Sequence, residues 1–273
     1  MKRQHEGILK GLSVALVMGG PGKEREVSLR SGAAVAGALR KCGAQVTTLD
    51  VTGPEFQLPE GTQLVFNIIH GTFGEDGGLQ AILDERGIPY TGEGTTGSRL
   101  AFDKIETKMC FERAGVPTCA WQTVLRGKTP DWKFPCVIKA PRQGSSVGVH
   151  IAHSPEDVPA ALEDCFQYGD RVLVEEFFIG RELTVGVLGQ QALPVVEIVP
   201  NEGFYDYEHK YTKCASKYHV PAQLPPELTA RIQEAALAAC RSLNLEVYSR
   251  VDILLAPDGR LNVLEINTIP GMT

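Results

Sequence analysis

Oxygen-bearing side chains gather near the C-terminal end of the sequence. Asp252 precedes the turn Pro257-Asp258-Gly259, and Glu265 and Asn267 follow it. If the turn joins two β-strands, the alternation of side chains places Glu265 and Asn267 on one face and Asp252 near one strand end. Carboxylate and amide oxygens suit Mg²⁺, which binds a few carboxylates together with nucleotide phosphates. The segment therefore predicts a magnesium site, and the alternative is a polar hairpin whose acids are solvated.

A loop rich in glycine and serine offers a second candidate site. Arg142-Gln143-Gly144-Ser145-Ser146-Val147-Gly148 lies between apolar stretches, and Lys139 precedes it. The N–H groups and hydroxyls of such a loop can bind phosphate oxygens, its glycines permit close approach, and the lysine adds positive charge. An ordinary flexible turn has the same composition.

A third candidate is the strand and linker pattern from Val172 to Glu182, which carries acidic residues on both sides of the linker. Its backbone could hold an adenine and Glu182 a ribose, while Phe177 and Phe178 supply apolar surface. Phenylalanines of a plain hydrophobic core would give the same pattern.

Two other glycine motifs fit their usual functions poorly. Gly92-x-Gly94-x-x-Gly97 matches the dinucleotide-binding pattern, but the strand before it is short and no strong helix pattern begins at its third glycine, which favours a linker. Gly20-x-Gly22-Lys23 lacks the spacing of a Walker phosphate-binding loop.

Composition narrows the class of protein. With 273 residues and 43% hydrophobic content, the chain can bury a large core and can divide into two or three domains. The net charge is −6 and the 27 basic residues are scattered, which argues against a nucleic-acid partner. Seven cysteines without a CxxC pair indicate thiols in a reducing compartment, and we expect a cytoplasmic protein. No apolar run is long enough to span a bilayer, so no membrane partner is expected.

Strand and helix patterns alternate along the chain. The N-terminal part predicts strands at 13–18, 46–51 and 64–69, with helices at 26–42 and 78–86. This order indicates a parallel sheet with ligand-binding loops at its strand ends. After a boundary at 92–97, we predict helices at 103–114, 155–167 and 226–243, strands at 121–125, 135–139, 172–175, 182–188 and 192–199, an irregular segment at 200–221 and the final hairpin.

These motifs, in this order, resemble the D-alanine–D-alanine ligases of the ATP-grasp superfamily. The resemblance runs from Ser13 to Thr273 through Glu24-Arg25-Glu26-Val27-Ser28, His70-Gly71-x-x-Gly74-Glu75-Asp76-Gly77, Asp103-Lys104, Lys139, Gly144-Ser145-Ser146-Val147-Gly148, Tyr205-Asp206-Tyr207, Lys210-Tyr211, Arg250-x-Asp252 and Glu265-x-Asn267-x-x-Pro270-Gly271-Met272-Thr273. It implies ATP-dependent joining of two D-alanines, through a D-alanyl phosphate, into the dipeptide used in peptidoglycan.

The same resemblance implies an α/β ATP-grasp fold with an N-terminal Rossmann-like domain. The expected domains are an N-terminal substrate domain at 1–96, a central ATP-grasp subdomain at 97–181 and a C-terminal ATP-grasp subdomain at 182–273, which carries the metal and catalytic residues. A homodimer is also implied, with D-alanine and ATP as the small-molecule partners.

Residue roles follow from the resemblance position by position. The implied metal ligands are Asp252, Glu265 and Asn267, which would hold two Mg²⁺ ions, with Mn²⁺ as a substitute. The implied ATP-binding residues are Lys104, Lys139, Ser145, Ser146, Glu175, Glu176, Phe178, Glu182, Lys210 and Asn267. The implied substrate-binding residues are Glu24, His70, Lys210, Arg250 and Gly271, and the implied catalytic residues are Glu24, Ser145, Tyr211, Arg250 and Gly271. A histidine such as His70, directly after an apolar strand, can equally be structural.

The sequence departs from the family at its C-terminal end. Family members continue past the Gly-Met-Thr motif with a serine-containing loop and a closing helix, so we expect a chain truncated at its C-terminus and lacking that terminal helix. A charge-assisted hydrogen bond lost there would cost about 1.5–3 kcal/mol. Two functions are therefore carried forward, an active ligase and an ATP- and D-alanine-binding family member or fragment that is catalytically impaired. A different ATP-grasp acid–amine ligase is a more distant alternative, which Lys210-Tyr211 and the His70 motif disfavour.

Overall fold

The computed structural model describes residues 7–200 and 216–272. The chain divides into two compact units. The smaller unit contains residues 1–99 together with 267–273, and the larger contains residues 100–266. Each unit is described by itself below.

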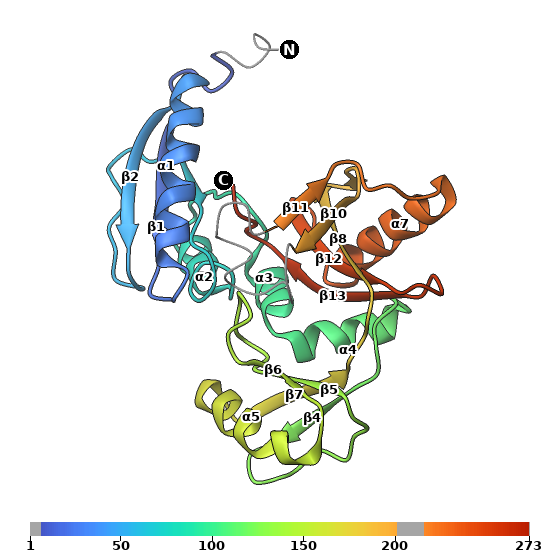
Figure 1. The fold of residues 1–273 in the computed structure, drawn as a ribbon. Helices are drawn as coiled ribbons and strands as arrows, with labels where there is room; N and C mark the ends of the chain where they lie inside the picture. Colours follow the sequence, from blue (N-terminus) through green and yellow to red (C-terminus); the bar gives the residue numbers. More distant parts are fainter. Residues whose placement is uncertain (1–6, 201–215, 273) are drawn as a thin grey trace. The chain divides into compact units, whose positions relative to one another are not determined.

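The smaller unit is built on a parallel three-stranded sheet. Its strands are β1 (Ser13–Gly19), β2 (Gln45–Val51) and β3 (Leu64–Asn67), in the order β2-β1-β3. Its helices are α1 (Arg25–Lys41), α2 (Gly78–Glu85) and the first part of α3 (Thr95–Phe102), within which the unit boundary lies. Figure 1 shows α1 lying along β1.

The two faces of this sheet are covered by different helices because side chains alternate along β1. Ala15 and Val17 pack in one buried cluster with Leu79 of α2, and Leu16 packs in another with Ala36 of α1. A strand that is apolar on both faces is typical of parallel sheets.

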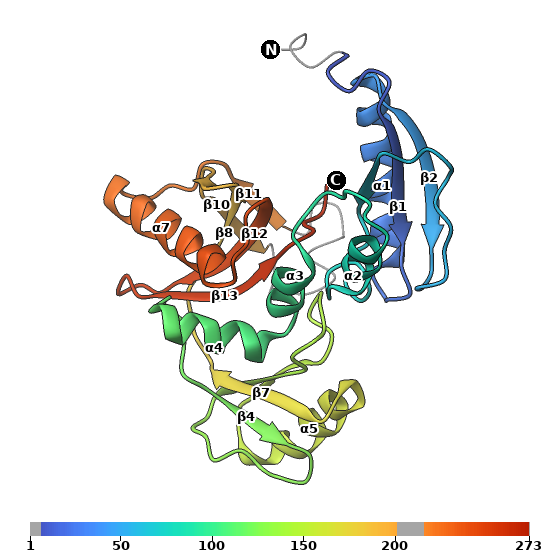
Figure 2. The ribbon, with the colours of Figure 1, turned by 180° about the vertical axis from the view of Figure 1, so that it is seen from behind.

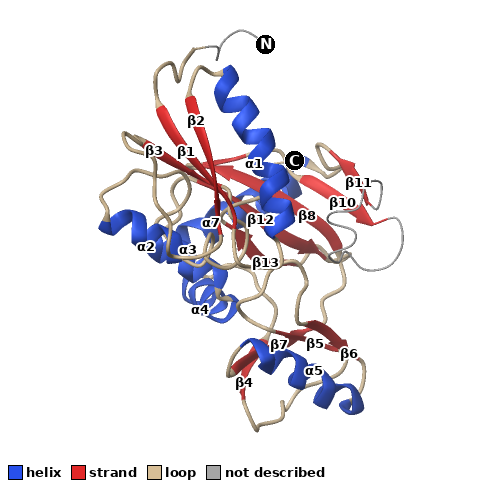
Figure 3. Ribbon diagram, turned by 90° about the vertical axis from the view of Figure 1, so that its left-hand side faces the viewer, coloured by secondary structure: helices blue, strands red, loops and turns tan. Residues whose placement is uncertain are grey.

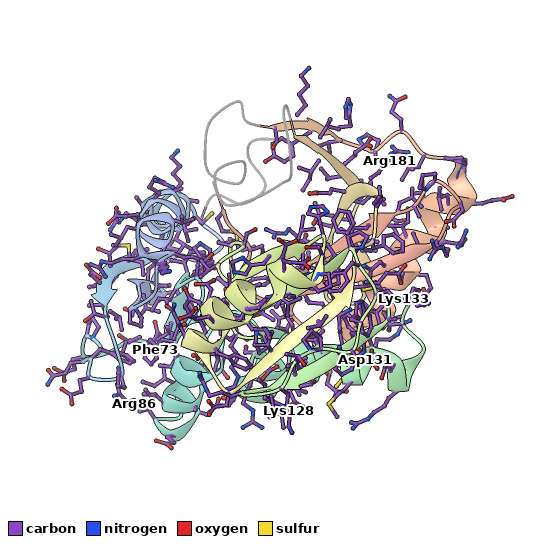
Figure 4. All side chains as sticks on the ribbon, turned by 60° about the horizontal axis from the view of Figure 1, so that its bottom comes forward. Phe73, Arg86, Lys128, Asp131, Lys133 and Arg181 are labelled. Carbon is purple, nitrogen blue, oxygen red and sulfur yellow. The ribbon has the colours of Figure 1, made fainter. Side chains whose placement is uncertain are left out.

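The loop after β2 is fastened by one aromatic ring. Phe56 contacts Phe73 edge-on, with 6.4 Å between ring centroids, and the Arg86 guanidinium lies 4.7 Å from the Phe56 ring centroid. Figure 4 labels Phe73 and Arg86, which lie in this unit.

The larger unit contains two antiparallel sheets. The first has the order β4-β7-β5-β6, and α5 packs against β5 and β6, as Figure 3 shows. Its elements are β4 (Trp121–Leu125), β5 (Cys136–Lys139), β6 (Val149–Ala152), β7 (Arg171–Glu176) and α5 (Val158–Cys165), with 3₁₀ turns at Pro155–Asp157 and Phe166–Tyr168 flanking α5.

The second sheet of this unit has the order β11-β10-β8-β12-β13, with β9 paired to β8. Its elements are β8 (Arg181–Leu188), β9 (Gln191–Ala192), β10 (Val196–Pro200), β11 (Ser216–His219), β12 (Tyr248–Leu255) and β13 (Leu261–Asn267), together with the helices α4 (Lys104–Ala114) and α7 (Pro226–Ser242). Helix α7 packs on β8 and β12 and also against α4 (Figure 2).

Local sequence explains where α4 begins and ends. The Asp103 carboxylate caps the helix by accepting hydrogen bonds from the N–H groups of Ile105 (3.1 Å) and Glu106 (3.4 Å). Gly115 ends the helix with a positive φ of 68°, which glycine adopts at little cost. The first residue of α4 is therefore fixed in place, and that residue is Lys104.

Most predicted elements are confirmed, and four predictions are wrong in detail. Helix α3 begins at Thr95, inside the segment interpreted as a linker. The expected strand 192–199 is split into β9 and β10 around Pro194, which has no N–H to donate to a ladder. The segment 200–221, expected to be irregular, contains strand β11 at Ser216–His219. Asp252 lies in the middle of β12, opposite Thr184, because pairing with β8 sets its position.

No disulfide joins the cysteines of the described residues. Within those residues, every helix is too short or too polar to cross a membrane.

Candidate functional site

One cavity of the larger unit collects most of the residues that the sequence singled out. Its volume is about 130 Å³. Both sheets, α4 and the loop after β5 contribute to its wall, which is formed by Lys104, Val137, Lys139, Gln143, Ser145, Ser146, Val149, Glu175, Glu176, Phe177, Phe178, Glu182, Leu183, Ile198, Asp252, Ile253, Leu254, Asn262, Leu264 and Glu265.

The lining combines two kinds of surface. Aliphatic and aromatic side chains such as Val137, Ile198 and Phe178 provide apolar wall, while Lys104 and Lys139 provide positive charge. A planar base needs the first kind of surface and a phosphate chain needs the second. The combination suits a nucleotide.

Lys104 joins three elements at the edge of the cavity. Its Nζ donates to the carbonyl of Gln143 at 2.8 Å and lies 3.0 Å from Glu265 Oε2. Only 12% of the Lys104 side chain is exposed. The ammonium therefore links the start of α4, the glycine-rich loop and β13.

The glycine-rich loop has an unusual backbone conformation. Ser145 and Ser146 both have positive φ angles, 52° and 61°. Residues other than glycine adopt this region at a cost of roughly 1–3 kcal/mol each, and such residues cluster at functional sites. Two backbone hydrogen bonds help to hold the loop, from Val147 N–H to the Gly144 carbonyl (3.1 Å) and from Ala140 N–H to the Gly148 carbonyl (2.8 Å). The loop is thus built with its two serines on the cavity wall.

Glu175 is buried between two lysines. Its side chain is 3% exposed, Lys108 Nζ lies 2.9 Å from its Oε2, and its Oε1 pairs with Lys139. Burial acts to raise the pKa of the Glu175 carboxyl, but the charges of Lys139 and Lys108 outweigh burial and lower that pKa to about 2. Burial likewise acts to lower the pKa of Lys139, and Glu175 outweighs it, so that pKa is raised. Both groups remain charged at neutral pH.

The linker between β7 and β8 is held by close contacts. A Cβ on Gly180 would stand 2.6 Å from the Leu255 carbonyl oxygen, so only glycine fits there. The Arg260 guanidinium lies 5.3 Å from the Phe178 ring centroid. Arg181, labelled in Figure 4, begins β8 and forms a two-pronged pair with Glu197 of β10 at 2.6 and 2.8 Å. These contacts fix Phe178 and Glu182 beside the cavity.

The acids expected to hold metal have basic partners in this structure. Asp252 pairs with Arg250 through two hydrogen bonds of 3.0 and 2.9 Å, and Thr184 donates a third at 2.7 Å. Glu265 pairs with Lys104. Asn267 is the last residue of β13 and belongs to the smaller unit. Carboxylate and amide oxygens are hard donors of the kind that Mg²⁺ binds, although no group of three His, Cys, Asp or Glu in the described ranges is placed to hold a metal ion.

The smaller unit brings Glu24 and the loop after β3 together. A Cβ on Gly71, whose φ is 71°, would stand 2.5 Å from Glu24 Oε2, so the carboxylate lies directly against this glycine. His70 is 4% exposed, and its Nδ1 lies 2.9 Å from the Ile269 carbonyl oxygen while its Nε2 lies 3.4 Å from Ser31 Oγ.

Glu75 binds the same C-terminal segment. One of its carboxylate oxygens accepts from Ile269 N–H at 3.0 Å and the other from Gly71 N–H at 2.7 Å. The backbone just before Gly271 is therefore held from both sides, by His70 and by Glu75.

Some expected residues fall elsewhere. Lys210 and Tyr211 lie outside the described residues, as does the rest of 201–215. Arg250 is not on the cavity wall but reaches it through Asp252. Sequence reasoning missed Lys108, whose one available signal is its position four residues after Lys104 on α4.

Comparison with known proteins gives a consistent result. A family profile described as D-ala D-ala ligase C-terminus matches residues 110–273. The D-alanine–D-alanine ligase of Methylacidiphilum infernorum is 47% identical over 260 residues, which cover 95% of this chain and 86% of that protein.

Solved structures show the same likeness. The Bacillus anthracis D-alanine–D-alanine ligase complexed with ATP matches with a TM-score of 0.82 and 28% identity, covering 96% of this chain and 87% of that one. The VanG D-Ala:D-Ser ligase of Enterococcus faecalis matches with a TM-score of 0.82 and 30% identity, covering 97% and 92%. The predicted α/β ATP-grasp fold is confirmed by these likenesses.

Proposed function

This chain belongs to the D-alanine–D-alanine ligase family, and we propose that it joins two D-alanines into D-alanyl-D-alanine with hydrolysis of ATP, for peptidoglycan synthesis. Membership in the family rests on the 47% sequence identity to the Methylacidiphilum infernorum ligase, which extends over 95% of this chain. The observation in the structure that supports the proposal best is the cavity, whose wall combines Lys104, Lys139 and the Ser145–Ser146 loop with apolar side chains and with acids that include Asp252 and Glu265.

A carboxylate is a poor electrophile, so the first D-alanine must be activated before an amine can attack it. Transfer of the γ-phosphoryl group of ATP to this carboxylate gives D-alanyl phosphate and ADP. The transition state carries concentrated negative charge, which preorganised cations stabilise. We assign Lys104, Lys139 and Lys210 to the phosphates, Ser145 and Ser146 to the loop that covers them, and Glu182 to the ribose.

The adenine would lie against the linker after β7. We assign the backbone around Glu175 and Glu176, together with the Phe178 ring, to this base. The Glu175 carboxylate is already bound by two lysines, which favours a contribution through its backbone rather than its side chain.

Asp252, Glu265 and Asn267 are the residues that we propose hold two Mg²⁺ ions, or Mn²⁺ in their place. When bound, the metal neutralises phosphate charge and orients the transferred group. Metal held by Glu265 and Asp252 would leave Lys104 and Arg250, which pair with these two acids here, to interact with anionic groups of the substrate.

In the second half of the reaction the amine of the second D-alanine attacks the acyl phosphate. The C–N bond forms, the carbonyl becomes a tetrahedral oxyanion, and inorganic phosphate then leaves with the oxygen that bridged carbon and phosphorus. We assign Arg250 and the Gly271 N–H to the oxyanion, where one donor is typically worth about 2.7–4 kcal/mol. We assign Glu24 to the ammonium of the first D-alanine, and Glu24, Ser145 and Tyr211 to the hydrogen-bonded set beside the attacking amine.

His70 is assigned to the substrate-binding set through the backbone that it holds. Its bond to the Ile269 carbonyl and the bond of Glu75 to the Ile269 N–H fix the segment leading to Gly271. The domain limits 1–96, 97–181 and 182–273, the homodimer and the cytoplasmic location also remain proposals, and the support for them is the family.

A coupled phosphate-release assay tests the function. Purified protein with ATP and Mg²⁺ should release phosphate only when D-alanine is added, and D-alanyl-D-alanine should appear in equal amount. D-serine and L-alanine serve as control substrates. ATP binding without D-alanine-dependent phosphate release would instead support the second candidate, a family member that binds its substrates but is catalytically impaired.

A further inference from the structure

Among the described residues, Lys108 of α4 is one of the largest fully buried side chains, at 1% exposure. Its Nζ donates to Thr118 Oγ1 at 2.7 Å and to Cys119 Sγ at 3.5 Å, and it lies 2.9 Å from Glu175 Oε2. Lys108 is not part of the cavity wall. No step of the proposed reaction uses it.

Glu175 connects this lysine to the cavity. While Oε2 is bound by Lys108, Oε1 pairs with Lys139, and the Lys139 side chain lines the cavity at 14% exposure. The three groups form a continuous row from the interior of the larger unit to the site of the phosphates. Cys119, which contacts Lys108, is itself held by a hydrogen bond from its N–H to Asn262 Oδ1 at 2.9 Å.

Stability is a poor reason for this arrangement. Removing each charge from water costs several kcal/mol, and well-packed apolar residues often replace buried ion pairs without loss. Helix α4 also carries Ile105 and Phe111, which are apolar and fully buried. An apolar residue at 108 would continue the same core.

We propose that Lys108 is a positioning residue for nucleotide binding, which holds Glu175 so that the ammonium of Lys139 is set toward the phosphates of ATP. The inference rests on the proposed function, because it takes the cavity as the ATP site.

Two effects follow from the row of charges. With both lysines present, the row carries a net charge of +1, which attracts phosphate. Without Lys108, Glu175 Oε2 loses its charged donor and keeps the weak Cys119 Sγ–H donor at 3.6 Å, so the carboxylate competes more strongly with phosphate for the Lys139 ammonium. The net charge of the row also falls to zero. Without Lys108, the Glu175 carboxylate still adjoins the Lys139 ammonium, and this charge favours its ionised form. The loss should therefore appear in the affinity for phosphates and not in that for the base.

The test compares ADP with adenosine. Lys108→Met keeps the length of the side chain and removes its charge. By calorimetry in metal-free buffer, the Kd of this variant for ADP should rise about tenfold, the low end for a lost charge-assisted hydrogen bond. Its Kd for adenosine should remain within about twofold of wild type. Phe111→Leu is the matched control, because it alters a buried residue of the same helix and should leave the ratio of the two Kd values unchanged.

A double variant separates positioning from general damage. In a Lys139→Met background, Lys108→Met should raise the Kd for ADP by a smaller factor than it does in wild type, because only the loss of charge remains when the Lys139 ammonium is absent. If Lys108→Met does not fold, Lys108→Arg takes its place. That variant keeps a cation but moves its donors, and it should raise the Kd for ADP by a smaller factor while leaving adenosine unchanged.

Equal losses for ADP and adenosine, or full additivity with Lys139→Met, would overturn the inference and leave the proposed function intact. Wild-type protein that binds neither ADP nor ATP would instead overturn the proposed function itself.

Discussion

Glu175→Gln should destabilise the larger unit strongly at neutral pH, and this effect should shrink in acid. The substitution leaves Lys108, 1% exposed, and Lys139, 14% exposed, without the carboxylate that they share. Removing one partner of a buried ion pair typically costs about 3–5 kcal/mol. Lys108 keeps its bond to Thr118, so we expect the lower end of that range, about 3 kcal/mol.

The pH dependence of stability gives an independent value for the free energy that the Glu175 carboxylate contributes. The pKa of Glu175 falls from its usual 4.5 to about 2 in the folded protein. A carboxyl with a depressed pKa contributes stability that is present above about pH 4.5 and is lost as pH falls toward 2. At about 1.36 kcal/mol per pH unit, this contribution is roughly 3 kcal/mol. About 1 kcal/mol of it should be gone by pH 3.5. Glutamine has no such contribution to lose.

Tryptophan fluorescence can follow the unfolding of this unit by urea, because the two tryptophans of the chain, Trp121 and Trp132, both lie in it. Wild type and Glu175→Gln are compared at pH 7 and pH 3.5. Asp170→Asn is the control, since it removes the same charge from an exposed pair with Arg126, 86% exposed at the aspartate, and such pairs contribute little. A difference in unfolding free energy between wild type and Glu175→Gln that stays constant from pH 7 to pH 3.5 would refute this reasoning.

Three further predictions concern the reaction. Lys139→Ala should weaken ATP binding even in metal-free buffer, whereas Glu265→Ala should raise the Mg²⁺ concentration needed for half-maximal phosphate release. Both assignments fail if the two variants show the metal dependence of wild type. Tyr211→Phe should raise the ratio of D-lactate to D-alanine incorporated at the second position near neutral pH, because losing the hydroxyl unpairs polar groups around the amine; an unchanged product ratio in competition would remove Tyr211 from this role. His70→Leu leaves the Ile269 carbonyl without its imidazole partner, so kcat should fall while the Kd for ATP alone stays constant, and an unaltered kcat would contradict a positioning role.

Local patterns predicted most of the fold. The apolar run before Gly19 predicts β1, and the helical spacing of apolar residues after Glu24 predicts α1. Both predictions succeed because a buried strand reads as a short apolar run and a half-buried helix as an apolar stripe. Pairing partners are not visible in local sequence, which is why Asp252 was expected at a strand end. Its place in the middle of β12 depends on register with β8.

The residues of the candidate site were likewise predicted only in part from the sequence. Lys139, Ser145 and Glu265 were predicted from residue type and order, and the structure brings them to one cavity. Lys108 could not be predicted, because a lysine on a helix usually faces solvent. Its partner Glu175 comes from a strand distant in the sequence, and only the three-dimensional structure shows the pair.

If the reaction passes through an acyl phosphate, the path of one oxygen atom can be predicted. Phosphate that leaves D-alanyl phosphate takes with it an oxygen that began in the D-alanine carboxylate. The reaction is therefore run with ATP, Mg²⁺ and D-alanine labelled with ¹⁸O in its carboxylate, and the inorganic phosphate is analysed by mass spectrometry. The account predicts one ¹⁸O in each phosphate released, with one D-alanyl-D-alanine formed per phosphate. Unlabelled phosphate accompanying the dipeptide, or labelled D-alanine left unreacted while ATP is hydrolysed, would contradict it.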